Sequence, residues 1–388
     1  MAIGPLEQRV RDKLKSRQER NILRKLSSPS ALVDFSSNDY LSLSKSPHLL
    51  DRFRSAISGT DEILGSGGSR LLDGTSHQHI LLDSTKGDAI VYDSFIHASV
   101  HDGMRASRVG SDLRIPFRHS SPNILGSQRA IREGKSCVFI AVESLYSMDG
   151  DIAPLDDLFP MGNGHLVVDE AHATGIYGPN GRGVVSMLGL ESRILVRLHT
   201  FGKALASNGA VIFTTPLIRE YLINYARSLI YTTSLANYNI IAMRCSLEML
   251  ELGIASKLSA RLLSLSEYLL TRLRVELSLV ENSPVTLPPD PQCKQSPTAH
   301  LTSPIIPLLT RNALSLASYL QSKHFLARPI RHPTVPLGEE RVRVCVHAGN
   351  TQAHVDGLLE AILQWAKKES SRTTEGLTGG VPTVGSRL

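Results

Sequence analysis

The stretch Leu198–Gly209 (LHTFGKALASNG) holds a single lysine, Lys203, among small, apolar and hydroxyl-bearing residues. The residues that follow, 210–215 (AVIFTT), predict a buried strand because most of them are β-branched or apolar. A lysine in such surroundings loses hydration, which lowers the pKa of its amine. A neutral amine is a nucleophile that can form a Schiff base with a carbonyl compound. An isolated lysine is more often an ordinary solvated loop residue, so this interpretation needs a second observation.

A second stretch, Gly164–Gly175 (GHLVVDEAHATG), supplies that observation. Its apolar run ends at Asp169, and His172 follows three residues later. In open α/β sheets, ligands bind outside the carboxyl ends of the strands. An aspartate there can pair with the protonated ring nitrogen of pyridoxal 5'-phosphate (PLP), and the histidine can hydrogen-bond the phenolate oxygen of the cofactor. The two stretches together indicate a PLP site.

Three further motifs lie in the same chain: Phe35–Leu41 (FSSNDYL), Gly65–Arg70 (GSGGSR) and Tyr146–Asp151 (YSMDGD). With the two stretches above, they make the sequence resemble the α-oxoamine synthase family of PLP-dependent enzymes. The resemblance runs from about residue 32 to about residue 367. Five motifs in the family's order are far more specific than any one of them.

The resemblance implies a fold-type-I PLP-dependent transferase, like aspartate aminotransferase. We expect a large α/β domain with a mostly parallel sheet and a smaller α+β domain made from both chain ends. The expected parts are an N-terminal helix and small-domain segment (1–45), the large PLP-binding domain (46–235), the C-terminal small domain (236–369) and a flexible tail (370–388). Sequence patterns predict a parallel strand at 137–143 and helices at 47–58, 237–252 and 354–367.

The family's activity is a decarboxylating condensation of an amino acid with an acyl-CoA. The member that this sequence resembles most uses L-alanine and pimeloyl-CoA in biotin biosynthesis. Four residues match the family's catalytic positions. Lys203 would bind the cofactor and carry the proton, Asp169 would pair with the ring nitrogen, and His172 would contact the phenolate. His97 would stack on the ring, although taken alone it would be an ordinary loop histidine.

Other positions match the family's cofactor and substrate contacts. Ser147 and Thr200 are expected at the cofactor. Thr232 and Thr233 match a turn that reaches the neighbouring subunit's cofactor phosphate, which implies a homodimer. The substrate carboxylate is expected at Arg343, with Arg331 as the second choice because a guanidinium binds carboxylates bidentately. Asn38 and Tyr40 are expected near the substrate.

The sequence departs from the family pattern between Leu82 and Ser84. There, family members continue through a helix, a strand and a Ser-Gly turn whose backbone N–H groups bind the PLP phosphate, as helix N-termini bind anions generally. About one βα unit, roughly 30 residues, is missing. A second, smaller deficit lies between Leu155 and Gly164. The gap predicts weakened phosphate binding and a less complete sheet, and a wrongly joined exon would produce it.

Composition sets broad limits. The 388 residues are 41% hydrophobic and 20% charged, which is ordinary for a globular protein with a large core. The net charge of +6 is spread along the chain, so we expect attraction of an anionic substrate and no nucleic-acid binding. The four cysteines are far apart and form no C-x-x-C motif, so neither a disulfide framework nor a metal site is indicated. No apolar run is long enough to span a bilayer.

The two ends of the chain bear on location. Residues 1–28 have helical spacing of apolar residues, and their acidic residues argue against a mitochondrial transit peptide. The C-terminal Ser386–Leu388 (SRL) resembles the peroxisomal Ser-Lys-Leu address, so we expect a peroxisomal protein, with the cytoplasm as the alternative.

Three alternatives stay open. The enzyme could use another amino acid or acyl-CoA, such as glycine with acetyl-CoA or an acyl chain from a polyketide pathway. The chain could instead be a pseudoenzyme that binds PLP poorly and serves as a partner subunit, as the missing phosphate loop suggests. The gap could also be an error in the gene model of an active enzyme.

Overall fold

The computed structural model describes residues 5–20, 23, 32–60, 88–119, 137–158, 164–289, 298 and 300–378. The motif at Gly65–Arg70, the Leu82–Ser84 junction and the C-terminal Ser386–Leu388 lie outside these residues, so the expectations attached to them stay predictions. The chain divides into two units, residues 1–32 and 33–388. The first unit contains helix α1 (Pro5–Glu19), which has no buried residue.

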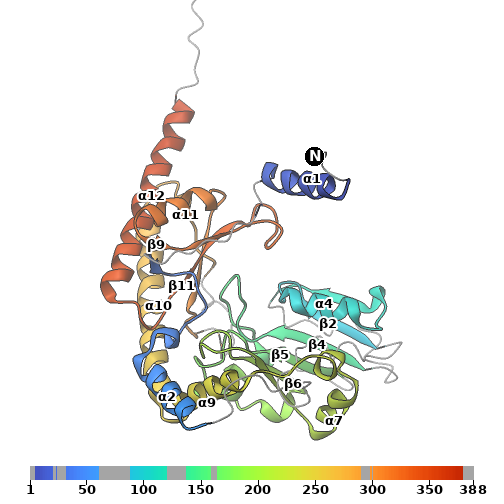
Figure 1. Ribbon diagram of the computed structural model, residues 1–388. Coiled ribbons are helices and arrows are strands. Elements are labelled where there is room, and N and C mark those ends of the chain that lie inside the picture. Colours follow the sequence, from blue (N-terminus) through green and yellow to red (C-terminus); the bar gives the residue numbers. More distant parts are fainter. Residues whose placement is uncertain are drawn as a thin grey trace, which may run out of the picture. The chain divides into compact units, whose positions relative to one another are not determined.

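The second unit contains a six-stranded sheet with the strand order β3-β2-β4-β5-β6-β7 (Figure 1). Neighbouring strands are parallel except for β6 and β7, which are antiparallel. The mostly parallel sheet predicted from the sequence is therefore present. Its strands are β2 (Ala89–Asp93), β3 (Arg114–Phe117), β4 (Val138–Glu143), β5 (Gly164–Asp169), β6 (Val196–Thr200) and β7 (Ala210–Thr214).

The middle strands are apolar on both faces because both faces are covered. On β4, Ile140 and Val142 belong to the main hydrophobic core, whereas Ala141 belongs to a second cluster. That second cluster includes Val100 of helix α4 (Ala98–Ala106). Successive side chains of a strand point to opposite faces, so the near-continuous apolar run of β4 fits a strand buried on both sides.

Helices also cover the β5–β6 part of the sheet. Val167 of β5 and Val196 of β6 pack with Leu222 and Leu229. These leucines come from α7 (Pro216–Tyr225) and α8 (Arg227–Ile230). The packing holds β5 and β6 in place beneath the loops that follow their carboxyl ends.

Strand β7 differs from the prediction. Residues 210–215 were expected to form a buried strand, but all five residues of β7 are partly or fully exposed, including Phe213 at 48%. The reason is its place at the end of the strand order, next to β6 alone. A run of β-branched residues predicts a strand but does not tell how many neighbours the strand has.

The rest of the second unit contains two smaller sheets. One is antiparallel with the order β10-β11-β8, and in the other β1 pairs in parallel with β9. The β1–β9 pair joins an N-terminal segment to the C-terminal part of the chain. Their bounds are β1 (Val33–Asp34), β8 (Ile305–Leu309), β9 (Phe325–Leu326), β10 (Arg328–Ile330) and β11 (Arg341–Cys345).

Long helices accompany these sheets: α10 (Ile254–Ser278), α11 (Ala313–Ser322) and α12 (Gln352–Thr378) (Figure 1). Helix α12 continues beyond the predicted end at residue 367. The expectation of a flexible tail from residue 370 is therefore wrong for residues 370–378, and residues 379–388 lie outside the described part of the chain. Polar composition alone does not end a helix, and no proline interrupts α12.

The predicted helices at 47–58 and 237–252 are present as α2 (Pro47–Ser58) and α9 (Asn237–Glu251), which contact each other. Helix α2 begins with proline in its first turn, and the Ser46 side chain accepts a hydrogen bond from the Leu49 backbone N–H (3.3 Å). No helix among the described residues is both long and apolar enough to cross a membrane. The shorter helical elements are α6 (Val184–Met187), η1 (Leu43–Lys45), η2 (Ser111–Leu113), η4 (Leu155–Leu158), η5 (Pro179–Gly181) and η6 (Glu191–Arg193).

Candidate active site

Four of the parallel strands of the large sheet end in a polar residue. β2 ends at Asp93, β4 at Glu143, β5 at Asp169 and β6 at Thr200. These strands are parallel, so their carboxyl ends meet at one edge of the sheet, the edge at which open α/β sheets bind ligands. The sheet therefore places the predicted residues Asp169 and Thr200 at one edge, together with two acids that the sequence interpretation did not assign.

Glu143 is the first of the residues that the sequence interpretation missed. It pairs in register with Asp169, and both side chains are buried. Burial and the nearby charge of Asp169 raise the pKa of the Glu143 carboxyl well above its usual range, although Lys203 opposes the shift. The protonated form of Glu143 is therefore favoured relative to an exposed glutamate. The sequence carried the signal, because Glu143 ends an apolar run in the same way as Asp169.

Lys203 lies in a tight turn between β6 and β7. The turn is closed by hydrogen bonds from the Ser207 backbone N–H to the Phe201 carbonyl (2.8 Å) and from the Phe201 N–H to the Gly209 carbonyl (2.9 Å). Gly209 has a φ of +109°, which glycine adopts without strain. Burial lowers the pKa of the Lys203 amine, while Asp169 raises it. The direction of this shift agrees with the prediction and favours a nucleophilic amine.

Tyr40 and His172 form a buried pair, with the Tyr40 hydroxyl 2.7 Å from His172 Nδ1. Burial, with Lys203 and Arg343 nearby, lowers the pKa of His172 well below its usual value, and burial raises the pKa of Tyr40. Both groups are neutral at pH 7. The pair is therefore a hydrogen bond between two neutral groups, in which one proton lies between the Tyr40 oxygen and His172 Nδ1.

Arg343 of β11 contacts two predicted site residues. Its Nη2 donates to Asn38 Oδ1 (3.3 Å), and its Nη1 donates to the Ser147 carbonyl (2.9 Å). Its Nε is buried and has no hydrogen-bond partner within the described residues. The Tyr40 hydroxyl also lies 3.3 Å from Asn38 Oδ1. The predicted substrate residues Arg343, Asn38 and Tyr40 therefore lie together. The Nε–H of Arg343 can donate a hydrogen bond to a substrate carboxylate.

The remaining predicted residues lie in loops or at the end of a strand. His97 is exposed and forms the N-cap of α4, where its Nδ1 accepts from the Ser99 N–H (3.2 Å). It is close enough to His172 to help lower the pKa of His172. Thr200 Oγ1 donates to the Gly209 carbonyl (3.2 Å).

Thr232 and Thr233 are exposed between α8 and α9, and Arg331 follows β10. The structure does not test the roles of Thr232, Thr233 and Arg331, which stay predictions.

A second buried polar cluster supports the loop that carries His172. The His199 Nδ1 lies 3.0 Å from the Thr174 hydroxyl, and the Val185 N–H donates to Glu170 Oε1 (3.0 Å). Burial lowers the pKa of His199 to about 4 and raises that of Glu170 to about 7. His199 is therefore neutral, so its approach to Glu170 (3.6 Å) is not an ion pair at pH 7. The cluster ties residues 170–185 to β6.

These groups fit PLP by their chemistry. Lys203 has an amine of lowered pKa for the aldehyde, and Asp169 is a buried carboxylate for the protonated ring nitrogen. His172 is a neutral imidazole that can hydrogen-bond the phenolate oxygen. The buried Nε of Arg343 has no hydrogen-bond partner within the described residues and suits a substrate carboxylate. The ring, the aldehyde and the substrate carboxylate thus each have a matching group, while Thr200 is the predicted phosphate contact at this edge.

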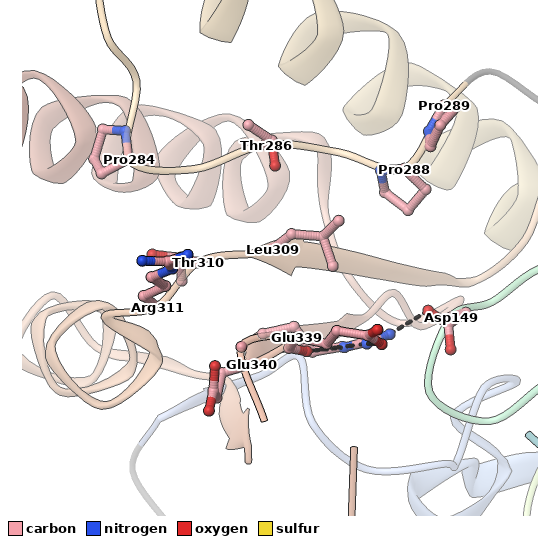
Figure 2. A pocket seen from close by; sticks show the side chains of 12 residues that line it. Asp149, Pro284, Thr286, Pro288, Pro289, Leu309, Thr310, Arg311, Glu339 and Glu340 are labelled. Atoms are coloured by element: carbon pink, nitrogen blue, oxygen red, sulfur yellow. Dashed lines mark hydrogen bonds and ion pairs between the residues drawn. The ribbon is translucent and has the colours of Figure 1, made fainter. Parts of the chain in front are cut away.

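A separate pocket of about 480 Å³ lies in the C-terminal part of the second unit (Figure 2). Proline-rich residues 284–289, the end of β8 and residues 338–341 line it, and Asp149 closes one side. Arg341 reaches from this pocket to Asp149, with which it forms an ion pair. Because Arg341 and Arg343 lie two residues apart on β11, this ion pair anchors the strand that carries Arg343, the predicted substrate-binding arginine.

Comparisons with known proteins place the chain in a family. The aminotransferase class I and II family matches residues 58–362. The chain is 43% identical to an 8-amino-7-oxononanoate synthase of Emericella nidulans, over 94% of this chain and 96% of that protein. It is 32% identical to an aminoacyl transferase, sphA, of Byssochlamys spectabilis, over 92% of this chain and 85% of that protein.

A solved structure shows the same fold. It is a serine palmitoyltransferase from S. paucimobilis with bound PLP, with a TM-score of 0.73 and 21% identity over 94% of this chain and 98% of that one. The alignment with the Emericella relative spans 411 positions but only about 365 residues of this chain, which is 94% of 388. About 46 aligned positions therefore have no counterpart in this chain.

The family match covers well over half of the chain, and the relatives align along nearly all of it. The fold is that of the fold-type-I PLP-dependent transferases, and the chain is an enzyme with PLP as its cofactor. This protein belongs to the aminotransferase class I and II family and, within it, to the PLP-dependent α-oxoamine synthases.

Proposed function

We propose that this enzyme condenses L-alanine with pimeloyl-CoA, releasing CoA and carbon dioxide, to give 8-amino-7-oxononanoate for biotin biosynthesis. The observation that carries the proposal is the 43% identity to the Emericella 8-amino-7-oxononanoate synthase over almost its whole length. The cluster of Arg343, Asn38 and Tyr40 supports it, because a small amino acid can bind there through its carboxylate alone.

The residues of the chain have separate tasks in this reaction. When bound, PLP supplies an aldehyde that takes up the amino group and a protonated ring that accepts the electrons released at Cα. Arg343 holds the substrate carboxylate. The buried amine of Lys203 takes the Cα proton, which its lowered pKa favours at neutral pH. Asp169 faces the ring nitrogen, and the raised pKa of Glu143 disfavours a second negative charge there.

The test is a substrate matrix with the purified, PLP-loaded protein. Alanine, glycine and serine are each combined with pimeloyl-CoA, acetyl-CoA and palmitoyl-CoA, and the release of CoA thiol is followed. We expect kcat/KM for alanine with pimeloyl-CoA to exceed every other pair by about tenfold or more. A higher value for any other pair would overturn the proposal and keep the enzyme class.

A second candidate is the same chemistry with other substrates. The 32% identity to the Byssochlamys sphA aminoacyl transferase favours it, because that relative is named as a different transferase. The substrate matrix separates the two candidates, because a preference for serine or for a long acyl chain would support the second.

We also propose that two copies form the active enzyme. Tyr231, Thr232 and Thr233 are exposed, and so are Leu217 and Tyr225 of the nearby helix α7, at 75% and 60%. Exposed apolar side chains next to the predicted phosphate contacts support a subunit interface there.

Mixing two inactive variants tests this arrangement. Lys203→Ala and a double Thr232→Ala, Thr233→Ala variant should regain up to about a quarter of wild-type activity when refolded together, because mixed dimers contain one intact site. The control pair, Lys203→Ala with Asp169→Asn, should regain none, since both changes affect the same subunit's part of the site. A monomer in light scattering, or no regain with the first pair, would contradict the proposal.

A further inference from the structure

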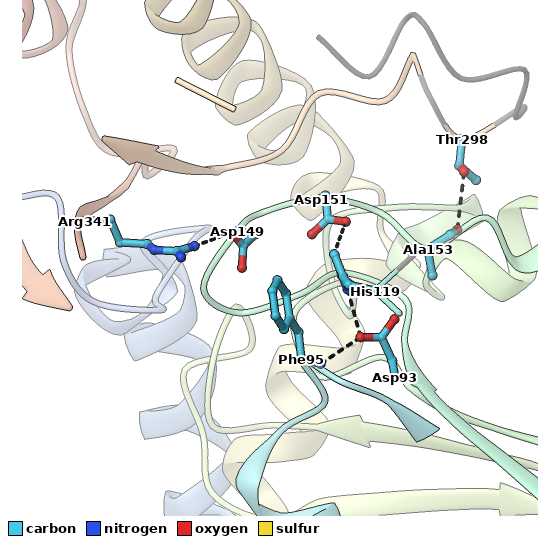
Figure 3. Close-up of polar contacts among 8 residues, drawn as sticks. All are labelled: Asp93, Phe95, His119, Asp149, Asp151, Ala153, Thr298 and Arg341. Carbon is cyan, nitrogen blue, oxygen red and sulfur yellow. Dashed lines mark hydrogen bonds and ion pairs between the residues drawn. The ribbon is translucent and has the colours of Figure 1, made fainter. Parts of the chain in front are cut away.

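His119 lies between two acids at the edge of the large sheet (Figure 3). It follows β3, and its Nδ1 is 2.8 Å from Asp93 Oδ1 while its Nε2 is 2.6 Å from Asp151 Oδ2. Burial alone would lower the pKa of His119, but the hydrogen bonds to Asp151 and Asp93 raise it to about 10. At neutral pH the ring is therefore an imidazolium that donates from both nitrogens.

Asp93 connects this cation to the turn that carries His97. The carboxylate oxygen that accepts from His119 also accepts from the Phe95 backbone N–H (2.8 Å). The Ile96 N–H donates to the Asp93 carbonyl (3.0 Å), and His97 begins α4 directly afterwards. The Phe95 ring stacks on the His119 ring, with 4.5 Å between centroids and 22° between planes. The position of His97 thus depends on a turn that His119 contacts on two sides.

Asp151 connects the same cation to the loop that carries Ser147. The Tyr146 N–H donates to the Asp151 carbonyl (3.0 Å), which closes the loop around Ser147. The Tyr146 ring meets the His119 ring edge-on, with centroids 4.5 Å apart. The Ser147 carbonyl accepts from Arg343 (2.9 Å), so the placement of this loop also fixes the substrate-binding guanidinium.

The two connections meet at His119. We propose that His119 is a positioning residue of the active site. As a cation, it hydrogen-bonds Asp93 on one side and Asp151 on the other. It thereby holds the turn that carries His97 in place relative to the loop that carries Ser147, whose carbonyl anchors Arg343. It acts through these residues and is not a catalytic residue. The inference rests on the shared PLP site and does not depend on which acyl-CoA the enzyme uses.

The test separates positioning from general stability. His119→Gln removes the charge and one of the two hydrogen bonds, and Ile362→Val in α12 serves as a control, because Ile362 is fully buried outside this cluster. The readouts are the thermal midpoint, the visible circular dichroism of bound PLP and the KM for the amino acid. For His119→Gln we expect an altered dichroism signal and an increase in this KM of about tenfold, because small misplacements of binding groups have large effects.

Ile362→Val should change the dichroism and the KM by less than about twofold. His119→Lys, which restores a cation with several donors, should recover part of the dichroism signal and of the KM. Wild-type dichroism and KM in folded His119→Gln would overturn the proposal. If His119→Gln does not fold, Asp151→Asn takes its place, because Asp151 is partly exposed, and an unchanged signal there would overturn the proposal equally. The dichroism needs only PLP, so a wrong choice of substrates would leave this result intact.

Discussion

At the scale of single residues, the site depends on how two neighbouring carboxyl groups divide their charge. Glu143 and Asp169 end adjacent parallel strands and pair in register, so the backbone alone makes them neighbours. Two buried carboxylates this close repel each other, and burial together with the charge of Asp169 raises the pKa of Glu143 well above its usual range. The raised pKa of Glu143 disfavours a second negative charge beside Asp169, the residue predicted to face a cationic ring nitrogen.

Lys203→Ala should abolish both the visible absorbance of bound cofactor and the condensation, because the amine is the cofactor's covalent partner and the proton acceptor. The measurement is the absorption spectrum after addition of PLP, followed by turnover with alanine and pimeloyl-CoA. Lys257→Ala, at an exposed position on α10, is the control and should behave as wild type. Wild-type turnover in Lys203→Ala would show that the central assignment is wrong.

Asp169→Asn should keep PLP bound but reduce kcat by about 10²-fold or more, because the ring nitrogen loses its charged partner. Steady-state kinetics on the PLP-loaded variant measure the effect, with PLP content determined separately. Asp157→Asn at an exposed position controls for the loss of one charge. A kcat within a few-fold of wild type, at equal PLP content, would refute the role of Asp169.

Residues inside local motifs could be predicted from the sequence, whereas residues that depend on strand order could not. Lys203, Asp169 and His172 lie within short patterns whose chemistry is local. Glu143 could have been found by the same rule as Asp169. His119 could not, because its partners lie 26 and 32 residues away and meet it only through the order of the strands.

At the scale of elements, the sequence predicts which segments form strands and helices. It predicts less well which neighbouring elements pack over them. Strand β4 and helices α2 and α9 formed where predicted, since apolar periodicity and helix-start signals are local. Strand β7 formed where predicted but is partly exposed, and α12 runs past its predicted end. Both errors concern what lies beside an element, which its own sequence does not contain.

His119 joins β2, β3 and the loop after β4, so the free energy of unfolding should depend on pH in the alkaline range. The folded pKa of His119 is about 10, above its usual value of 6.5. A raised pKa means that the stabilising charge is fully present below about pH 6.5 and is lost as the pH rises to about 10. The difference in free energy of unfolding between wild type and His119→Gln should therefore shrink over this range.

Urea denaturation at several pH values from about 6 to about 10.5 measures this difference. Subtracting the variant removes the contribution of lysines and tyrosines that titrate in both proteins. A difference that stays constant across the range would mean that His119 is not the titrating group.

At the scale of the whole molecule, the chain retains the catalytic edge of the sheet and lacks about 46 positions that its Emericella relative has. Inserting that relative's segment between Leu82 and Ser84 should lower the Kd for PLP by about tenfold or more, because each hydrogen bond to a charged group contributes roughly 1.5–3 kcal/mol. Fluorescence titration of PLP into both proteins measures the change.

A glycine-serine insert of equal length controls for chain length and should leave the Kd unchanged. Equal Kd values for the natural chain and the chain with the relative's segment would mean that another part of the protein already supplies the phosphate donors. The effect concerns the whole molecule, because no single residue of the remaining site shows where a segment is missing.

The position of β7 at the end of the sheet has a consequence for handling the protein. Within the part of the chain that the structure describes, β7 pairs on one side alone, so its other side presents backbone N–H and C=O groups. The strand and its flanks, residues 209–215, contain no charge and no proline. Such a segment is a template for cross-β association between molecules. Concentrated or heated samples should therefore aggregate through this strand, and a lysine at Phe213, whose ring is 48% exposed, should keep them in solution longer.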